Sequence, residues 1–110
     1  MKTIIATVCL AFLAGTAGAQ LIIPDLEPPA EYLINPGGVQ IDVLIRDNAA
    51  EFCAMASGVS DAQACAISPE HTENGHCLIV MPSKKSQFGR DPWFSLIWRH
   101  EKAHCYGWRH

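Results

Sequence analysis

The sequence lacks a long apolar run beyond its first residues, and it lacks any cluster of basic side chains. After residue 19 no stretch approaches the roughly 20 apolar residues that a transmembrane helix needs, which argues against membrane insertion. The basic residues are scattered and the formal net charge is −3. This argues against nucleic acid as a partner, because proteins that bind nucleic acid concentrate Lys and Arg on one face.

The N-terminus has the composition of a secretory signal peptide. Lys2 supplies a positive charge, residues 4–13 form a short apolar run, and Ala17, Gly18 and Ala19 suit a cleavage site of small residues. We therefore expect residues 1–19 to be removed. The protein is then exported, either to a bacterial periplasm or to the outside of the cell.

Four of the five cysteines follow the expected cleavage site, and an even number in an exported chain predicts two disulfides. Three pairings are open, because spacing alone does not choose among them. A free or metal-binding thiol is the alternative, chiefly at Cys105 because it lies beside His104. The remaining chain is long enough for one domain, yet short enough to need such cross-links. The four residues are Cys53, Cys65, Cys77 and Cys105.

The order of patterns predicts a small α+β domain with a short sheet of about three strands and two helices. Prolines and glycines in residues 20–38 predict an extended lead-in that wraps the domain or hangs free. Alternating apolar residues predict the first strand, and two further apolar segments joined by a polar loop predict a hairpin. Asp91 and Pro92 are typical of a helix start. The expected strands are residues 39–46, 64–67 and 77–81, the expected helices are 48–57 and 92–106, and the domain is 39–110.

The last helix carries the residues with the clearest chemistry. His100 and His104 are four residues apart, so both imidazoles project from one face and can bind one ion. Glu101 follows the first histidine, where its carboxylate can take a proton from water without being a ligand. This HExxH pattern is typical of metal-assisted hydrolysis. By itself it also arises by chance on amphipathic helices.

A third histidine makes the pattern more specific. On an unbroken helix His110 would be rotated about 240° from His104 and carried roughly 9 Å along the axis, away from the ion. Gly107 lies between the two, where a left-handed cap can end the helix and turn the chain back. We therefore expect His100, His104 and His110 to bind one metal ion.

Residues 100–110, with the pattern HExxHxxGxxH, resemble the zinc-binding signature of the metzincin metallopeptidases. The resemblance covers about a tenth of the chain and implies a small zincin-like domain with Zn²⁺ as cofactor. It implies that the three histidines are ligands, that Glu101 is the catalytic base and that a peptide or protein is the substrate. It also makes residues 77–81 the candidate strand for lining a substrate cleft. In that family a methionine-containing turn follows the third histidine, and this sequence ends at His110 without one.

Two other functions compete with a zinc peptidase. The first is a non-catalytic zinc-binding module of the cell envelope, stabilised by metal and disulfides. The second is a disulfide-rich binding protein in which the motif is accidental. Several further residues have a functional and an ordinary interpretation: His76 as a substrate contact, Tyr106 and Arg109 as donors to an oxyanion, and Trp108 as a shield over the metal.

Overall fold

The strand patterns of the sequence form one mixed sheet in the computed structural model, which describes residues 23–110. The expected signal peptide at residues 1–19 lies outside the described residues. Each element lies within two residues of its predicted bounds. The strands are β1 (Ile41–Arg46), β2 (Cys65–Ile67) and β3 (Cys77–Pro82), and the helices are α1 (Ala49–Ser57) and α2 (Trp93–Cys105).

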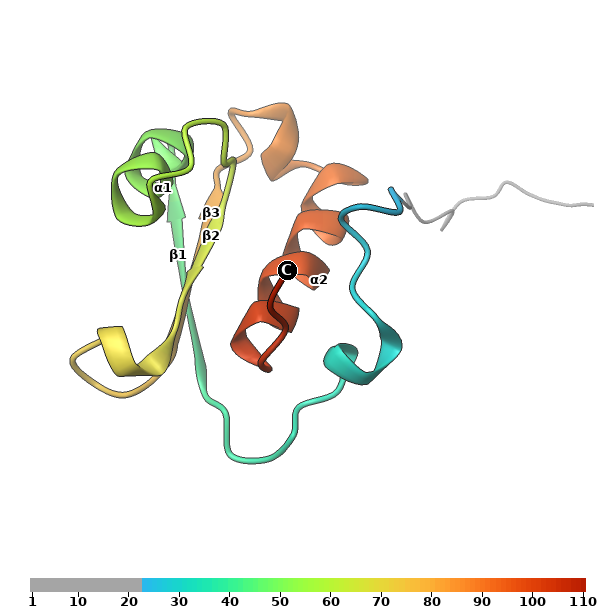
Figure 1. Cartoon of the computed structure of the whole chain (residues 1–110). Helices are drawn as coiled ribbons and strands as arrows, with labels where there is room; N and C mark the ends of the chain where they lie inside the picture. The colour runs from blue at the N-terminus through green and yellow to red at the C-terminus, as the bar shows by residue number, and fades with distance from the viewer. Residues whose placement is uncertain (1–22) are drawn as a thin grey trace, which may run out of the picture.

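The central strand of the sheet is β3. It pairs in parallel with β1 and antiparallel with β2, so the strand order is β1-β3-β2. Helix α1 and helix α2 lie on opposite sides of the sheet (Figure 1). A central strand that is covered on both faces has to be apolar throughout, and Ile79, Val80 and Met81 are fully buried. The predicted α+β fold with three strands and two helices is confirmed.

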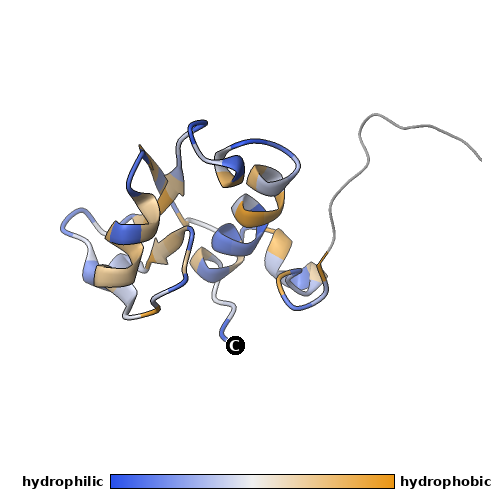
Figure 2. Ribbon diagram, turned by 90° about the horizontal axis from the view of Figure 1, so that it is seen from above, coloured by the Kyte–Doolittle hydropathy of each residue, from blue (hydrophilic) through white to orange (hydrophobic). Residues whose placement is uncertain are grey.

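The core has two parts because successive strand residues point to opposite faces. Ile79 and Met81 pack with Phe94 and Ile97 of α2, whereas Val80 packs on the α1 side of the sheet. Figure 2 shows hydrophobic residues along the strands and alternating hydrophobic and hydrophilic residues along α2. Each helix therefore buries one apolar stripe against its own face of the sheet.

Both predicted disulfides are present, and each joins a helix to a strand. Cys53 of α1 is bonded to Cys65 of β2, and Cys77 of β3 is bonded to Cys105 of α2. By the chain-entropy account each bridge stabilises the fold by about 3 kcal/mol. The second bridge fixes the end of α2, next to His104, to the central strand. It also removes Cys105 from the candidate metal ligands.

Part of the predicted lead-in packs against α2. The Arg99 guanidinium lies 2.8 Å from the Glu27 carboxylate, and both side chains are largely buried. Residues Ala30–Leu33 form a 3-10 turn beside the same helix. Of the two alternatives for this segment, the described residues therefore wrap the domain. Within residues 23–110 no helix is both long and apolar enough to cross a membrane.

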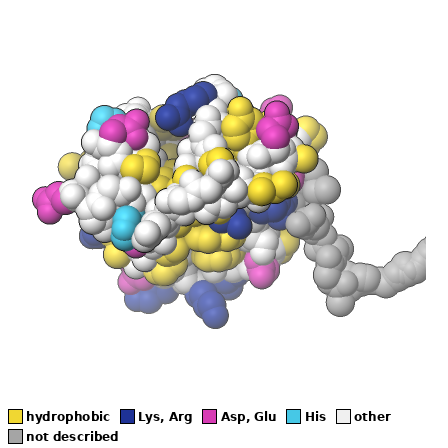
Figure 3. Space-filling model, turned by 90° about the horizontal axis from the view of Figure 1, so that it is seen from below, with side chains coloured by type: hydrophobic (Ala, Val, Ile, Leu, Met, Phe, Trp, Pro, Cys, Tyr) yellow, Lys and Arg dark blue, Asp and Glu magenta, His cyan; other side chains and the backbone are white. Residues whose placement is uncertain are grey.

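The first strand is more exposed than its sequence pattern predicts. Alternation in residues 39–46 predicts one face on the core, and Ile41 does pack against it. Val43 and Ile45 point to the same face, yet they are 47% and 50% exposed. The reason is position, because β1 is an edge strand of the sheet. Exposed hydrophobic side chains also gather in the middle of the face seen from below (Figure 3).

Candidate metal centre

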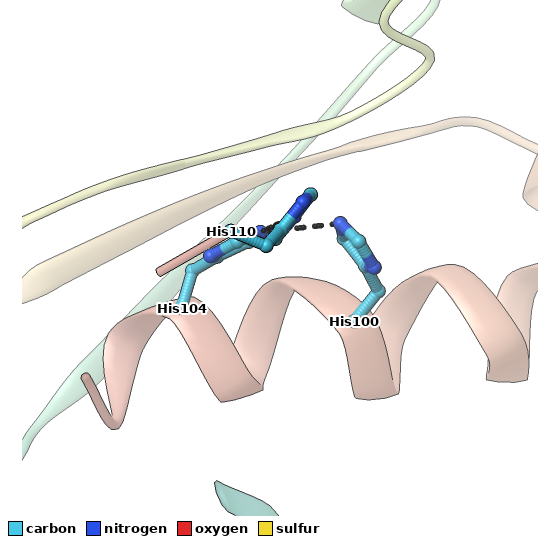
Figure 4. Close-up of side chains that lie close together, drawn as sticks. All are labelled: His100, His104 and His110. Carbon is cyan, nitrogen blue, oxygen red and sulfur yellow. Dashed lines mark hydrogen bonds between the residues drawn. The ribbon is translucent and has the colours of Figure 1, made fainter. Parts of the chain in front are cut away.

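Helix α2 presents the first two histidines on one face. The helix begins at Trp93, one residue later than predicted, and Asp91 accepts a hydrogen bond from the Ser95 backbone N–H. Ala103 and Leu96 are fully buried on the inner side of the helix. His100 and His104 lie one turn apart and project toward the same point (Figure 4).

Gly107 ends the helix in the way that the sequence predicts. Its φ is +108°, a region that residues with a side chain rarely adopt. The Gly107 N–H donates to the His104 carbonyl, and the Trp108 N–H donates to the Ala103 carbonyl. This pair of bonds is a Schellman cap, which reverses the chain direction. The reversed chain brings His110 back over the helix.

The three imidazoles converge through their Nε2 atoms. The His104 Nε2 lies 3.1 Å from the His100 Nε2 and 3.1 Å from the His110 Nε2. The three ligand atoms all lie within 4.8 Å of one another (Figure 4). Three histidines in this arrangement could hold one metal ion. The convergence agrees with the expectation from the sequence.

Backbone carbonyls fix the orientation of two of these rings. The Nδ1 of His100 lies 2.8 Å from the Leu26 carbonyl, and the Nδ1 of His104 lies 2.8 Å from the Trp108 carbonyl. A carbonyl only accepts, so each Nδ1 carries the proton and each Nε2 offers a lone pair. Facing lone pairs repel one another unless a cation lies between them. Outer carbonyls of this kind are typical of histidines that bind metals.

The Leu26 carbonyl is a feature of the site that the sequence does not reveal. Leu26 and His100 are 74 positions apart, and a backbone carbonyl has no signature in the sequence. The neighbouring Glu27–Arg99 pair holds this segment on α2. The lead-in therefore contributes to the orientation of the first ligand.

A cavity of about 570 Å³ surrounds the histidine cluster. On one side it is bounded by β2, whose other edge is not paired within residues 23–110. The interpretation that residues 77–81 form the cleft strand is wrong, because β3 is paired on both sides and has no free edge. Strand β2 borders the cavity instead. The cavity is also lined by apolar side chains, among them Leu26, Val59, Phe88, Trp93 and Ile97.

Glu101 lines the same cavity and is only 8% exposed. Burial raises the pKa of its carboxyl group from 4.5 to about 7. Within residues 23–110 the carboxyl group has no hydrogen-bond or ion-pair partner. Burial also lowers the pKa values of His100 and His104, which favours the neutral imidazoles that metals require. The Glu101 carboxyl group and the three histidines therefore share one partly desolvated cavity.

The other sequence candidates divide into two groups. Trp108 stacks on the His104 ring at 5.1 Å and meets the His100 ring edge-on, so it covers one side of the cluster. Arg109 lines the cavity, whereas Tyr106 packs against the core. His76 pairs with Asp42 instead and is not part of the cavity lining.

The turn at Gly107 gives a first prediction. Gly107→Ala forces a side chain into a positive φ, which costs about 1–3 kcal/mol of stability or moves the turn. We expect zinc affinity to fall as well, because the turn positions His110. Gly58→Ala is the matched control, since Gly58 has φ +79° at the end of α1. Isothermal titration with zinc should show a loss only in Gly107→Ala. Equal affinities in the two variants would contradict this role for the turn.

The buried carboxyl group gives a second prediction, for the metal-free protein. Because its folded pKa is raised, the folded state binds a proton that the unfolded state releases between pH 4.5 and about 7. Stability is therefore lost as the pH rises through this window, by about 3 kcal/mol in all. Glu101→Gln has no carboxyl group at this position, so its stability should not fall in this way. Its advantage in unfolding free energy over the wild type should grow between pH 4.5 and pH 8, as measured by urea denaturation.

The exposed Glu51→Gln variant is the control for this pH series. His100 and His104 are present in all three proteins, so their titration cancels in the comparison. Parallel stability curves for Glu101→Gln and the wild type would show that the carboxyl group is not desolvated.

Comparisons with protein-family models, curated proteins and solved structures gave no match. Function therefore has to be inferred from the chemistry of the cavity itself. That chemistry combines three convergent imidazoles, one buried carboxyl group and a strand edge that is unpaired within residues 23–110.

Proposed function

We propose that this protein is an exported zinc-dependent peptidase in which Glu101 acts as the general base. One observation carries the proposal: the Nε2 atoms of His100, His104 and His110 converge in the cavity that the Glu101 carboxyl group lines. A metal ligand set and a proton acceptor in one cavity are the two parts that metal-assisted hydrolysis needs.

The donor set favours zinc. Catalytic zinc sites commonly use three protein ligands and leave a position open, and zinc binds imidazole nitrogen at about 2.0–2.1 Å. Two such nitrogens in a tetrahedral arrangement lie about 3.3 Å apart, close to the 3.1 Å found for two of the three nitrogen pairs, and all three nitrogens lie within 4.8 Å of one another. All four cysteines in the described part of the chain are in disulfides, so none of these four offers a thiolate to close the site.

Glu101 has the environment of a general base. A bound zinc ion supplies a Lewis acid that polarises the scissile carbonyl and acidifies water. The carboxylate of Glu101 accepts the proton of the attacking water and later delivers it to the leaving amine. In the metal-free protein burial raises the pKa of this carboxyl group to about 7, so the group can both take up and release a proton near neutral pH. The nearby cation lowers that value when it is bound.

Strand β2 is the surface on which we place the substrate. An extended peptide can add to an unpaired strand edge through backbone hydrogen bonds. Ala64, Cys65, Ala66 and Ser68 border the cavity from this edge. A peptide on β2 therefore passes in front of the histidines. Phe88, Trp93 and Ile97 offer apolar contacts to its side chains.

The disulfides and the N-terminal sequence support the export that we propose. Two disulfides form and persist in an oxidising compartment, such as a periplasm or the outside of the cell. The signal-like residues 1–19 support export.

The test is peptide cleavage by the purified, zinc-loaded protein. A mixture of random peptides is incubated with the protein, and the cleavage products are identified by mass spectrometry. We expect cleavage that a chelator abolishes and that added zinc restores. A protein that binds zinc and melts at a higher temperature with it, yet cleaves nothing, would instead be the non-catalytic zinc module.

A further inference from the structure

We propose that this chain forms a symmetric dimer through the edge of β1, with β1 of one copy antiparallel to β1 of a second copy. Within residues 23–110 β1 pairs only with β3, on its other side. The strand exposes three consecutive apolar residues, Val43, Leu44 and Ile45. Native proteins usually protect such an edge, because exposed backbone groups and apolar side chains bind another strand.

The backbone determines which residues can pair across this edge. The Gln40 carbonyl accepts from the Cys77 N–H, and the Arg46 carbonyl accepts from the Ser83 N–H. Even-numbered residues of β1 therefore direct their backbone groups toward β3. Because the direction alternates along a strand, Val43 and Ile45 direct theirs outward. A second strand can form hydrogen bonds only with these outward groups.

One register allows both the backbone hydrogen bonds and favourable side-chain pairs across the edge. With the two-fold axis at Leu44, Val43 of one copy faces the partner's Ile45 as a hydrogen-bonded pair. Leu44 then faces the partner's Leu44, and Asp42 faces the partner's Arg46. Apolar cross-strand pairs and opposite charges both stabilise a sheet. Moving the axis to Val43 instead places Asp42 opposite the partner's Leu44 and loses both ion pairs.

The charges needed for this register are in place. Hydrogen bonds from Asn74 and His76 hold the pKa of the Asp42 carboxyl group below its usual value, so it is negative at neutral pH. Asp42 is 47% exposed. Arg46 lies over the Phe52 ring and donates one hydrogen bond to Asn48, which holds the guanidinium near the strand. Its other N–H groups can donate to a carboxylate.

The dimer leaves the candidate metal centres accessible. Strands β1 and β2 are opposite edges of the sheet, with β3 between them. Pairing through β1 therefore gives a continuous six-stranded sheet, with one cavity at each outer end. This inference does not depend on the proposed peptidase activity.

The first test is the mass of the folded protein, with both disulfides intact, by sedimentation equilibrium up to millimolar concentration. We expect a reversible dimer. Asp42→Arg should raise the dissociation constant about tenfold or more, because it places two arginines opposite each other. Adding Arg46→Asp to it should restore the dimer, since the charges are then exchanged. Met55→Lys, on the exposed face of α1, is the matched control and should leave the dimer unchanged.

The second test fixes the register. Residues opposite each other in a non-hydrogen-bonded pair lie close enough for a disulfide. Leu44→Cys should therefore cross-link two copies on air oxidation, whereas Val43→Cys should not, because Val43 faces the partner's Ile45. Circular dichroism confirms that each variant is folded. A monomer at all concentrations, a dimer that Asp42→Arg leaves intact, or cross-linking through Val43→Cys alone would overturn the proposal.

Discussion

Glu101→Gln should reduce peptide hydrolysis by about 10²–10⁴-fold, because a positioned general base contributes a factor of that size. The substitution keeps the shape of the side chain in a position that is only 8% exposed. It removes the only function that the proposal gives this residue, which is to accept a proton. Zinc content should stay at one ion per chain, because Glu101 is not among the three convergent ligands.

The measurement is kcat/KM for a peptide found in the cleavage screen, together with zinc analysis of the same preparation. Glu51→Gln is the control because it makes the same chemical change at an exposed position on α1. Activity retained in Glu101→Gln would remove the proposed base. Lost zinc in this variant would show that the carboxylate is a ligand instead.

His110→Ala should weaken zinc binding by more than about 100-fold, since changes outside the ligand shell already cost about 10–100-fold. His110 is exposed and lies against the rings of His100, His104 and Trp108, outside both core clusters, so its removal leaves the core intact. The Nε2 atoms of His100 and His104 remain, but two ligands cannot hold the ion as three do. Competition with a chromogenic chelator measures the affinity.

His71→Ala is the control for this substitution, because His71 is exposed and outside the cluster. Unchanged zinc affinity in His110→Ala would mean that His110 is not a ligand and that only the shorter HExxH pattern binds the ion. The turn at Gly107 would then have no role in binding.

The local elements could be predicted because their signals are local. Alternation gives β1, Gly58 ends α1, and Gly107 ends α2 with the expected positive φ. Asp91 lies one residue before the N-cap Pro92, so the helix begins one residue later than its position predicts, although Asp91 still accepts a hydrogen bond from the Ser95 N–H in the first turn. The same is true of the three histidines, because a helix and one turn of the chain determine their convergence.

The arrangement of the sheet could not be predicted in the same way. Whether β3 is central or at an edge depends on which strands pair, and residues far apart in the sequence decide that. Apolar residues form most of both β1 and β3, yet Ile79 is buried and Ile45 is half exposed. The sequence therefore favours β3 as the strand with a free edge, whereas β3 is paired on both sides and β2 borders the cavity with its outer edge unpaired within residues 23–110.

The contacts that the lead-in makes with the histidine site could not be predicted either. Its prolines predict an extended segment, but nothing in them indicates that the Leu26 carbonyl meets His100. The Glu27–Arg99 pair joins residues 72 positions apart and is equally invisible in a local pattern. Backbone acceptors and distant ion pairs become visible only with the fold.

The most direct test of this account is the zinc-edge X-ray absorption spectrum of the zinc-loaded protein. We expect three imidazole nitrogens at about 2.0–2.1 Å from one ion, completed by an oxygen ligand. In His110→Ala the number of imidazole ligands should fall to two, or the protein should no longer bind zinc. A wild-type spectrum with sulfur ligands, or with fewer than three imidazoles, would contradict the claim that Gly107 turns the chain to bring His110 to the metal.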